Sequence, residues 1–164
     1  MAKNEEPSIV SIPVTRANHV VPIYRVTLVR EPTVLESLRT AVRKSSEAAE
    51  LMRPLFTDLD REHFVVLMLD AQHRPIGLNI VSIGSLTASV VHARETFKPA
   101  ILSNSAAVIV AHNHPSNSVE PSPEDIELSR RLREAGEILG IRVLDSIIIG
   151  AGNRFYSFVD AEGW

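Results

Sequence analysis

The segment that most constrains how this chain can fold is an apolar run that ends in two histidines. Residues 106–111 are apolar and rich in β-branched side chains, a composition typical of a short strand buried on both faces of a sheet. His112 and His114 follow at once, and residues two apart on an extended chain point the same way. Both imidazoles can therefore reach one point near the carboxyl end of the strand, where α/β folds tend to place their sites.

A helix start follows these histidines closely. Ser122 suits the N-cap and Pro123 the first helical position, with an acid, Asp125, three residues after the serine. Asp125 shares a face of the predicted helix with an apolar stripe at steps of three and four residues. The stripe consists of Leu128, Leu132, Ala135 and Leu139. A carboxylate on that inward face needs a partner, because an unpaired buried charge is costly.

The two histidines and the aspartate form a candidate metal site. Two imidazoles and one carboxylate suit Zn²⁺, and three protein ligands with water in the fourth position are typical of catalytic zinc. A non-haem Fe(II) site uses the same ligand types. Ser122 and Asp125 also form an ordinary capping box, and an H-x-H pair alone is more often structural. Because all these residues share one strand–loop–helix unit, we predict that His112, His114 and Asp125 bind zinc.

These residues resemble the motif of the JAMM (MPN+) metalloproteases, in which an upstream Glu precedes H-x-H, seven residues and S-x-x-D. The spacing from His114 to Ser122 and Asp125 fits that motif without a gap. The bacterial RadC-like branch is the closer likeness, because it shares H-N-H-P-S at residues 112–116 and the phrases L-G-I, L-D and I-G within residues 139–150. The resemblance implies one α/β domain of JAB/MPN type, with a central mixed β-sheet flanked by helices in a cytidine-deaminase-like layout.

The resemblance also implies catalytic roles. The family's upstream Glu stands at the start of a core strand, and residues 62–70 resemble that strand, so Glu62 is predicted to be the general acid/base. Its rival, Glu95, falls in the opening of a predicted helix, where a negative charge is favourable in itself. Ser122 is implied as the donor to the oxyanion at the scissile carbonyl. The implied reaction is zinc-dependent hydrolysis of a peptide or isopeptide bond.

Three positions show how far the resemblance extends. Asn117 stands where RadC-like chains usually have Gly, and Asn is the residue besides Gly that best tolerates positive φ. Ser146 stands where the related phrase commonly has His, so no role of that histidine carries over. Asn113 agrees with the RadC-like branch, whereas eukaryotic isopeptidases carry Ser or Thr there. Specificity for ubiquitin-like substrates is therefore not carried over.

Length and composition limit the domain organisation, the cysteine chemistry and the location of the protein. The 164 residues suit one domain, and the absence of cysteine excludes disulfides, Cys-ligated zinc and a thiol nucleophile. Residues 1–22 are predicted to form an N-terminal arm and residues 23–164 a single RadC-like JAB/MPN domain, with its motifs within about residues 62–158. Because neither a membrane-length apolar stretch nor a leader is visible, we expect a soluble cytoplasmic protein. A homodimer is left open.

Patterns of hydrophobicity predict the remaining elements. The predicted strands cover residues 24–29, 64–69, 76–83, 106–111, 142–149 and 154–158. The predicted helices cover residues 34–55, as one helix or a broken pair, and residues 94–103 and 123–139, the last of which Gly140 ends.

Nucleic-acid binding is not favoured by the charge. The net charge is −3 and the sequence pI is about 6.1, the opposite of a basic binder. Longer RadC-like proteins carry an N-terminal region resembling helix-hairpin-helix motifs, and here every glycine lies at Gly77 or later, so we expect no such region. The basic cluster Arg130-Arg131-Arg133 shares its predicted helix with several glutamates, which favours a solvated face.

Three hypotheses of function follow. The leading one is a JAMM-type zinc metallopeptidase or isopeptidase that acts on an unidentified protein or peptide. The second is a RadC-like accessory protein in DNA repair or mobile-element biology, whose metal site is not proteolytic. The third is a metal-binding scaffold without activity. The presence of Glu62 and Ser122 beside the three ligands favours the first, because a scaffold needs neither a base nor an oxyanion donor.

Overall fold

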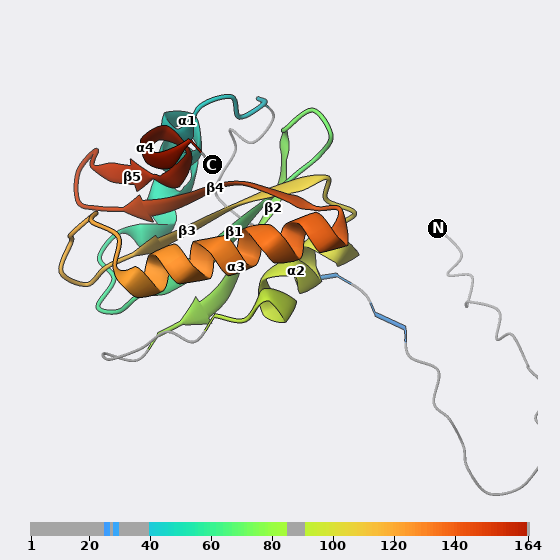
Figure 1. Cartoon of the computed structure of the whole chain (residues 1–164), viewed down its shortest axis with the longest axis horizontal. Helices are drawn as coiled ribbons and strands as arrows, with labels where there is room; N and C mark the ends of the chain where they lie inside the picture. Colours follow the sequence, from blue (N-terminus) through green and yellow to red (C-terminus); the bar gives the residue numbers. More distant parts are fainter. Residues whose placement is uncertain (1–24, 27, 30–39, 85–90, 164) are drawn as a thin grey trace, which may run out of the picture.

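A five-stranded sheet, in the order β2-β1-β3-β4-β5, forms the centre of the computed structural model (Figure 1). The structure describes residues 25–26, 28–29, 40–84 and 91–163. The elements in chain order are α1 (Ser45–Met52), the 3₁₀ helix η1 (Arg53–Phe56), β1 (His63–Leu69), β2 (Pro75–Ile83), α2 (Ala93–Leu102), β3 (Ala107–Asn113), α3 (Pro123–Leu139), β4 (Arg142–Ile149), β5 (Phe155–Ser157) and α4 (Phe158–Glu162).

The sheet is mixed. Strand β1 pairs antiparallel with both β2 and β3, β3 pairs parallel with β4, and β4 pairs antiparallel with β5. A parallel pair needs a crossover between its strands, and α3 provides it. The predicted α/β fold with a central mixed sheet flanked by helices is confirmed.

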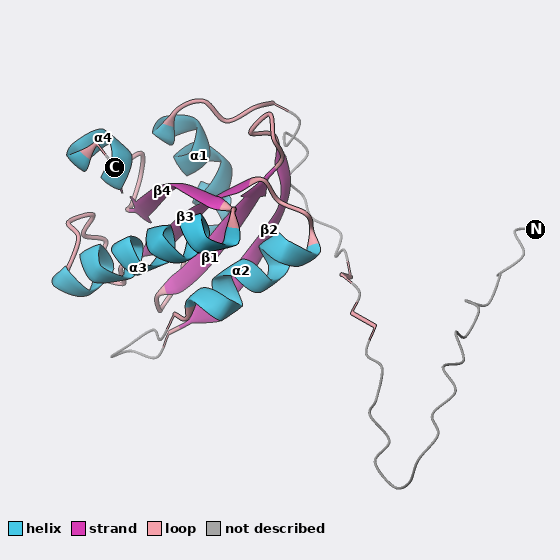
Figure 2. Cartoon of the chain, turned by 45° about the vertical axis from the view of Figure 1, so that its right-hand side comes forward, coloured by secondary structure: helices cyan, strands magenta, loops and turns pink. Residues whose placement is uncertain are grey.

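Helices cover both faces of the sheet, with α2 and α3 on one face and α1 on the other (Figure 2). Alternate residues of a strand enter opposite cores, so Leu67 and Ile109 pack with the α1 side, and Val66 and Val108 with the α2 and α3 side. Every residue of β3 is buried, as predicted for a strand covered on both faces.

Strand β3 continues further than the sequence pattern predicts. His112 pairs with Phe64 of β1 and with Ile148 of β4, and Asn113 pairs with Ile149. The predicted strand ended at residue 111 because the apolar run stops there. Sheet pairing on both sides extends it, so His112 belongs to the strand.

Near the N-terminus, the predicted helix over residues 34–55 is confirmed from residue 45 onward and wrong over residues 40–44, and the predicted strand over residues 24–29 is wrong at the residues that the structure describes. Residues 40–44 are not helical, and the predicted helix over residues 34–55 is α1 followed by η1; residues 34–39 lie outside the described residues. Pro54, which lacks an amide hydrogen, stands where the α-helix gives way to η1. Residues 25, 26, 28 and 29 belong to no strand, against the strand predicted over residues 24–29. The predicted arm over residues 1–22 lies outside the described residues.

At the C-terminus, the predicted strand over residues 154–158 is shorter, and α4 follows it unpredicted. Ser157 caps α4 by accepting from the Asp160 amide at 3.1 Å, and its hydroxyl donates to the buried Asp145 carboxylate at 2.6 Å. Because Asp145 lies on β4, this helix start depends on a contact between strands. Among the described helices, none is long and apolar enough to cross a membrane.

Candidate metal centre

His112 is fixed by packing at the end of β3. Its side chain is 2% exposed, and its ring stacks on Phe64 with centroids 6.0 Å apart and planes inclined by 14°. Its Nδ1 is buried without a hydrogen-bond partner, whereas its Nε2 faces His114 and Asp125. The nitrogen left for a metal is therefore Nε2.

His114 is oriented by the loop that follows the strand. Its Nδ1 lies 3.1 Å from the carbonyl oxygen of Ser118, a distance suited to donation of the Nδ1 hydrogen. That tautomer leaves the lone pair on Nε2, a common arrangement for a metal-binding imidazole. Asn117 has φ 58° and its amide donates to the His114 carbonyl at 2.9 Å, so this residue adopts the positive φ that Asn tolerates.

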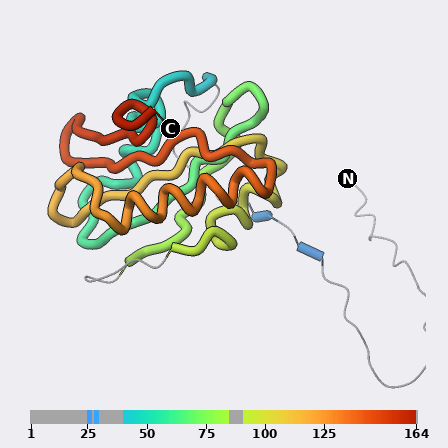
Figure 3. Tube along the Cα trace, in the orientation of Figure 1, coloured from blue at the N-terminus to red at the C-terminus, as the bar shows by residue number. Residues whose placement is uncertain are grey.

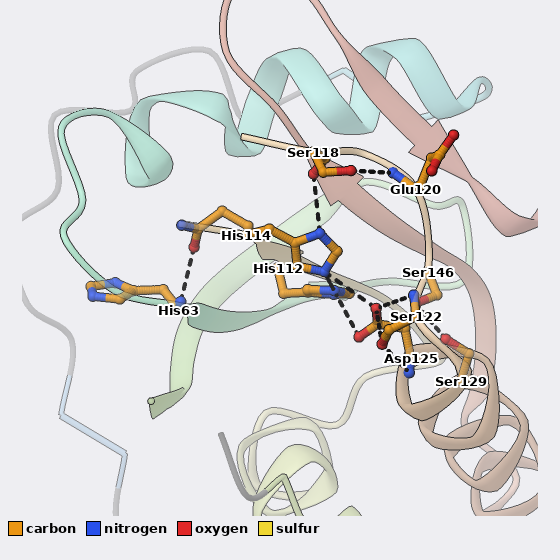
Figure 4. A network of polar contacts seen from close by, with 10 residues as sticks. His63, His112, His114, Ser118, Glu120, Ser122, Asp125, Ser129 and Ser146 are labelled. Carbon is orange, nitrogen blue, oxygen red and sulfur yellow. Dashed lines mark hydrogen bonds and ion pairs between the residues drawn. The ribbon is translucent and has the colours of Figure 1, made fainter. Parts of the chain in front are cut away.

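Asp125 lies in the first turn of α3, where the capping box aims it. The Ser122 amide donates to Asp125 Oδ2 at 2.8 Å, and the Ser122 hydroxyl donates to the same oxygen at 2.6 Å and accepts from the Asp125 amide. The carboxylate in turn faces both imidazoles, with Oδ1 3.1 Å from His112 Nε2 and Oδ2 3.2 Å from His114 Nε2 (Figure 4). The capping box and the candidate metal site are thus one structure.

The candidate donor atoms lie close enough together to share one metal ion, because one ligand atom from each residue falls within 4.8 Å of the others. The Nε2 atoms of His112 and His114 lie 3.2 Å apart, close to their distances from the Asp125 oxygens. Zinc bonds of about 2.0–2.1 Å in tetrahedral geometry place neighbouring ligand atoms about 3.3 Å apart. These three residues could hold a metal ion, and their chemistry suits zinc.

Charges in the group support metal binding by Asp125. Burial by itself raises the pKa of Asp125, but hydrogen bonds from His112, His114 and Ser122 outweigh it and hold this pKa well below its usual 3.8. The hydrogen bond to Asp125 raises the pKa of His114 above its usual 6.5. The carboxylate therefore stays ionised, while a proton competes with a metal for His114.

Glu62 precedes β1 and is half-buried beside the same group. Burial raises its pKa, and the next largest influences are the charges of His112, Asp125 and His114. Glu62 therefore lies within the electrostatic reach of all three candidate ligands, as a base for a coordinated water would.

Asn113 ties the backbone around Glu62 to β3. Its side chain, on the opposite face of β3 from His112, accepts from the His63 amide at 2.9 Å and donates to the Arg61 carbonyl at 3.2 Å. Both neighbours of Glu62 are thereby held to the strand that carries the candidate ligands. The His63 ring itself points away from them (Figure 4).

The rival acid, Glu95, is engaged elsewhere. It lies in the first turn of α2, with its carboxylate 2.5 Å from Lys98 Nζ and 3.5 Å from Arg94 Nε. The hydrogen bond from Lys98 lowers the pKa of Glu95, and none of the candidate ligands contributes to that shift. Pairing with Lys98 and Arg94 at the surface accounts for the presence of an acid at position 95.

Sequence reasoning missed several supporting residues. Asn113 carried a signal only as the middle residue of H-N-H, and Ser118 carried none because it contributes its backbone carbonyl. Ser129, one helical turn after Asp125, donates to Ser146 at 2.8 Å in a buried pair behind the centre (Figure 4). Ser146 of β4 thus accepts a hydrogen bond from α3.

Fold and site together define an α/β domain of JAB type with a candidate metal centre at the end of β3. A family model described as RadC-like JAB domain matches residues 42–164, and the chain belongs to this family.

Curated relatives agree with this family. A UPF0758 protein of Geobacter sulfurreducens is 56% identical over 106 residues, which cover 65% of this chain and 46% of the relative. A UPF0758 protein of Desulforudis audaxviator is 53% identical over 116 residues, covering 71% and 50%. One of Rubrobacter xylanophilus is 47% identical over 114 residues, covering 70% and 50%. The chain spans about half the length of these relatives.

Proposed function

We propose that this protein is a zinc-dependent hydrolase of peptide or isopeptide bonds, with a protein or peptide as substrate. The observation that carries the proposal is the convergence of His112, His114 and Asp125 within the electrostatic reach of Glu62. Three ligands with one open position and a neighbouring base form the minimal arrangement for metal-assisted hydrolysis.

Each residue has a role in this mechanism. His112, His114 and Asp125 would hold the zinc, which when bound supplies Lewis acidity and lowers the pKa of a coordinated water to near neutrality. Glu62 takes the proton from the attacking water and returns it to the leaving amine. Its raised pKa suits both steps, because a carboxylate becomes a stronger base as its pKa approaches the working pH.

Ser122 is proposed as the donor to the developing oxyanion. Its hydroxyl has one hydrogen, which is donated to Asp125 Oδ2. Donation to an oxyanion therefore requires that hydrogen to turn away from Asp125. Until it does, Ser122 orients a metal ligand.

The described structure offers no observation in favour of a DNA-associated role. Within the basic cluster of α3, Arg130 forms ion pairs with Glu127 and Glu134, and Arg133 lies 3.8 Å from Glu137. Arg130 and Arg133 thus have acidic neighbours on the same helix, as expected of a solvated helix face.

The test is metal content followed by hydrolysis. Elemental analysis of protein purified without chelator should find about one zinc per chain, and none in the H112A/H114A double variant. The zinc-loaded protein should then cleave members of a panel of fluorogenic peptides and isopeptides, and a chelator should abolish cleavage. A folded parent that binds no zinc when zinc is supplied would refute the proposal.

A further inference from the structure

A cavity of about 480 Å³ adjoins the candidate metal centre and shares His114 with it. Three segments distant in sequence line it: η1 with the turn that follows, the loop between β3 and α3, and the turn between β4 and β5. The last two lie at the same end of the sheet (Figure 3). A side chain of a substrate held at the metal centre therefore has a space beside it.

Arg53 contributes a guanidinium to this cavity, and the described residues accept hydrogen bonds from only one of its three nitrogens. Its Nη1 donates to the carbonyls of Gly150 at 3.0 Å and Gly152, and makes a long 3.5 Å contact to that of Arg154. Nε and Nη2 make no hydrogen bond or ion pair with any described residue. The acid that lines the same cavity, Asp58, is exposed and forms no ion pair with Arg53.

This arrangement favours an anionic ligand. The guanidinium is held in place by carbonyl contacts, so little further side-chain entropy is lost on binding. Its two unused nitrogens form the edge that binds a carboxylate through two parallel hydrogen bonds. Arg53 is half-buried and its contacts among the described residues are all to carbonyls, so it gains most from a partner of opposite charge.

We propose that this cavity, the Arg53 pocket, binds a carboxylate of the substrate next to the scissile bond. The carboxylate belongs to an acidic side chain or to a free chain terminus. Phe56 and Ile149 offer apolar walls for methylene groups, while Gly150 and Gly152 leave their part of the lining without side chains. The proposal rests on the proposed hydrolase function, whose substrate class it narrows.

The R53K variant separates a loss of carboxylate recognition from a loss of structure. Arg53 also ties η1 to the turn between β4 and β5, so R53M removes an anchor and a ligand site together. R53K keeps a cation that can donate to the same carbonyls but lacks the two-nitrogen edge. R61K is the matched control, because Arg61 pairs with Asp60 at the surface and does not line the cavity.

The experiment titrates zinc-loaded protein with short peptide hydroxamates by calorimetry, because a hydroxamate binds zinc and holds the neighbouring residue beside it. The probes carry Glu, Gln or Lys next to the hydroxamate, each with an amidated terminus, and a further Gln probe has a free carboxylate terminus. The Glu probe or the free-terminus probe should bind about tenfold more tightly than the amidated Gln probe, as expected of a bidentate ion pair. Which of the two gains identifies the source of the carboxylate.

In R53K that advantage should fall to about twofold or less, while R61K retains it. Equal binding of all probes to the parent, or an advantage unchanged in R53K, overturns the proposal. A second measurement needs no metal: N-acetylglutamate amide should shift the Arg53 Nε–H signal in the NMR spectrum of metal-free protein, and the glutamine analogue should not. If no zinc binds, the hydrolase proposal fails while this signal still decides on the pocket.

Discussion

The metal centre and the Arg53 pocket share His114 but are built in opposite ways. At the centre, the two imidazoles and the carboxylate face one another, the Nδ1 of His112 is buried without a hydrogen-bond partner, and all three candidate ligands lie within residues 112–125. The pocket joins Arg53 to carbonyls 97 and 99 residues away, and two of its guanidinium nitrogens have no partner among the described residues. A candidate ion site can thus be assembled from one short segment, whereas the proposed recognition pocket needs segments far apart in the sequence.

The largest effect should come from removing the carboxylate of the centre. D125A should lower bound zinc to well below one equivalent and, through the lost capping box, lower the free energy of unfolding by about 1 kcal/mol. Elemental analysis and chemical denaturation measure the two effects. E124A, an exposed acid in the same turn, is the control. Full zinc content in a folded D125A would remove Asp125 from the ligand set.

The next prediction separates the base from the ligands. E62Q should retain zinc and lose hydrolysis by about 10²–10⁴-fold, because general-base catalysis is removed while the ligands stay. E95Q should leave both unchanged, since Glu95 pairs with Lys98 at the surface. Hydrolysis assays beside metal analysis test this. If E95Q were inactive and E62Q active, the base would be misassigned.

The third prediction concerns Asn113, whose side chain binds the backbone on both sides of Glu62. N113A leaves the His63 amide and the Arg61 carbonyl without their partner, at a cost of about 1–3 kcal/mol of unfolding free energy. Zinc content should persist while hydrolysis falls. Combined with E62Q, the substitution should cause no further loss of hydrolysis, because Asn113 acts through Glu62. An additive loss in the double variant would assign Asn113 a separate role.

The protonation of His114 should make the stability of the metal-free protein depend on pH. The raised pKa of His114 means that its interaction with Asp125 stabilises metal-free protein fully below pH 6.5, and that this contribution is lost as the pH rises through the raised value. The lowered pKa of Asp125 contributes stability above pH 3.8 that is lost as the pH falls through its folded value. Metal-free stability from this pair should therefore be largest between these limits.

Zinc affinity should show the opposite trend, because zinc displaces the proton of His114. It should fall about tenfold for each pH unit below the raised pKa of His114. Denaturation of metal-free protein and zinc titrations across pH 5 to 8 test the two trends. A zinc affinity that is constant over that range would contradict the protonation of His114.

The smallest effect concerns the loop between the two regions. Asn117 has φ 58°, which Gly adopts without strain, so N117G should change the free energy of unfolding by less than about 1 kcal/mol. N117A should be destabilising by about 1 kcal/mol, because Ala tolerates positive φ less well than Asn. Thermal denaturation of both variants measures this. Equal stability of N117A and the parent would mean that the loop adapts its backbone.

The local parts of the structure could be predicted from sequence. The strand over residues 142–149, the helix over residues 123–139 and its end at Gly140 have the predicted bounds, and Gly140 has φ 69°. Helix caps, proline positions and hydrophobic periods act over a few residues, so they can be recognised in the sequence. The H-x-H spacing and the capping box also predicted that His112, His114 and Asp125 lie together, and in the structure these three residues could hold a metal ion.

Contacts between distant segments could not be predicted in this way. Glu62 was chosen by resemblance, and its position beside the ligands depends on the pairing of β1 with β3 and on Asn113, 52 residues from Arg61. The start of α4 depends on Asp145 of β4, and the Arg53 pocket on three separate segments. Short-range patterns therefore determined the candidate metal-binding motif. Sheet register, which only the folded chain sets, decided which acid stands beside it, and the packing of η1 against the turn between β4 and β5 decided which arginine does.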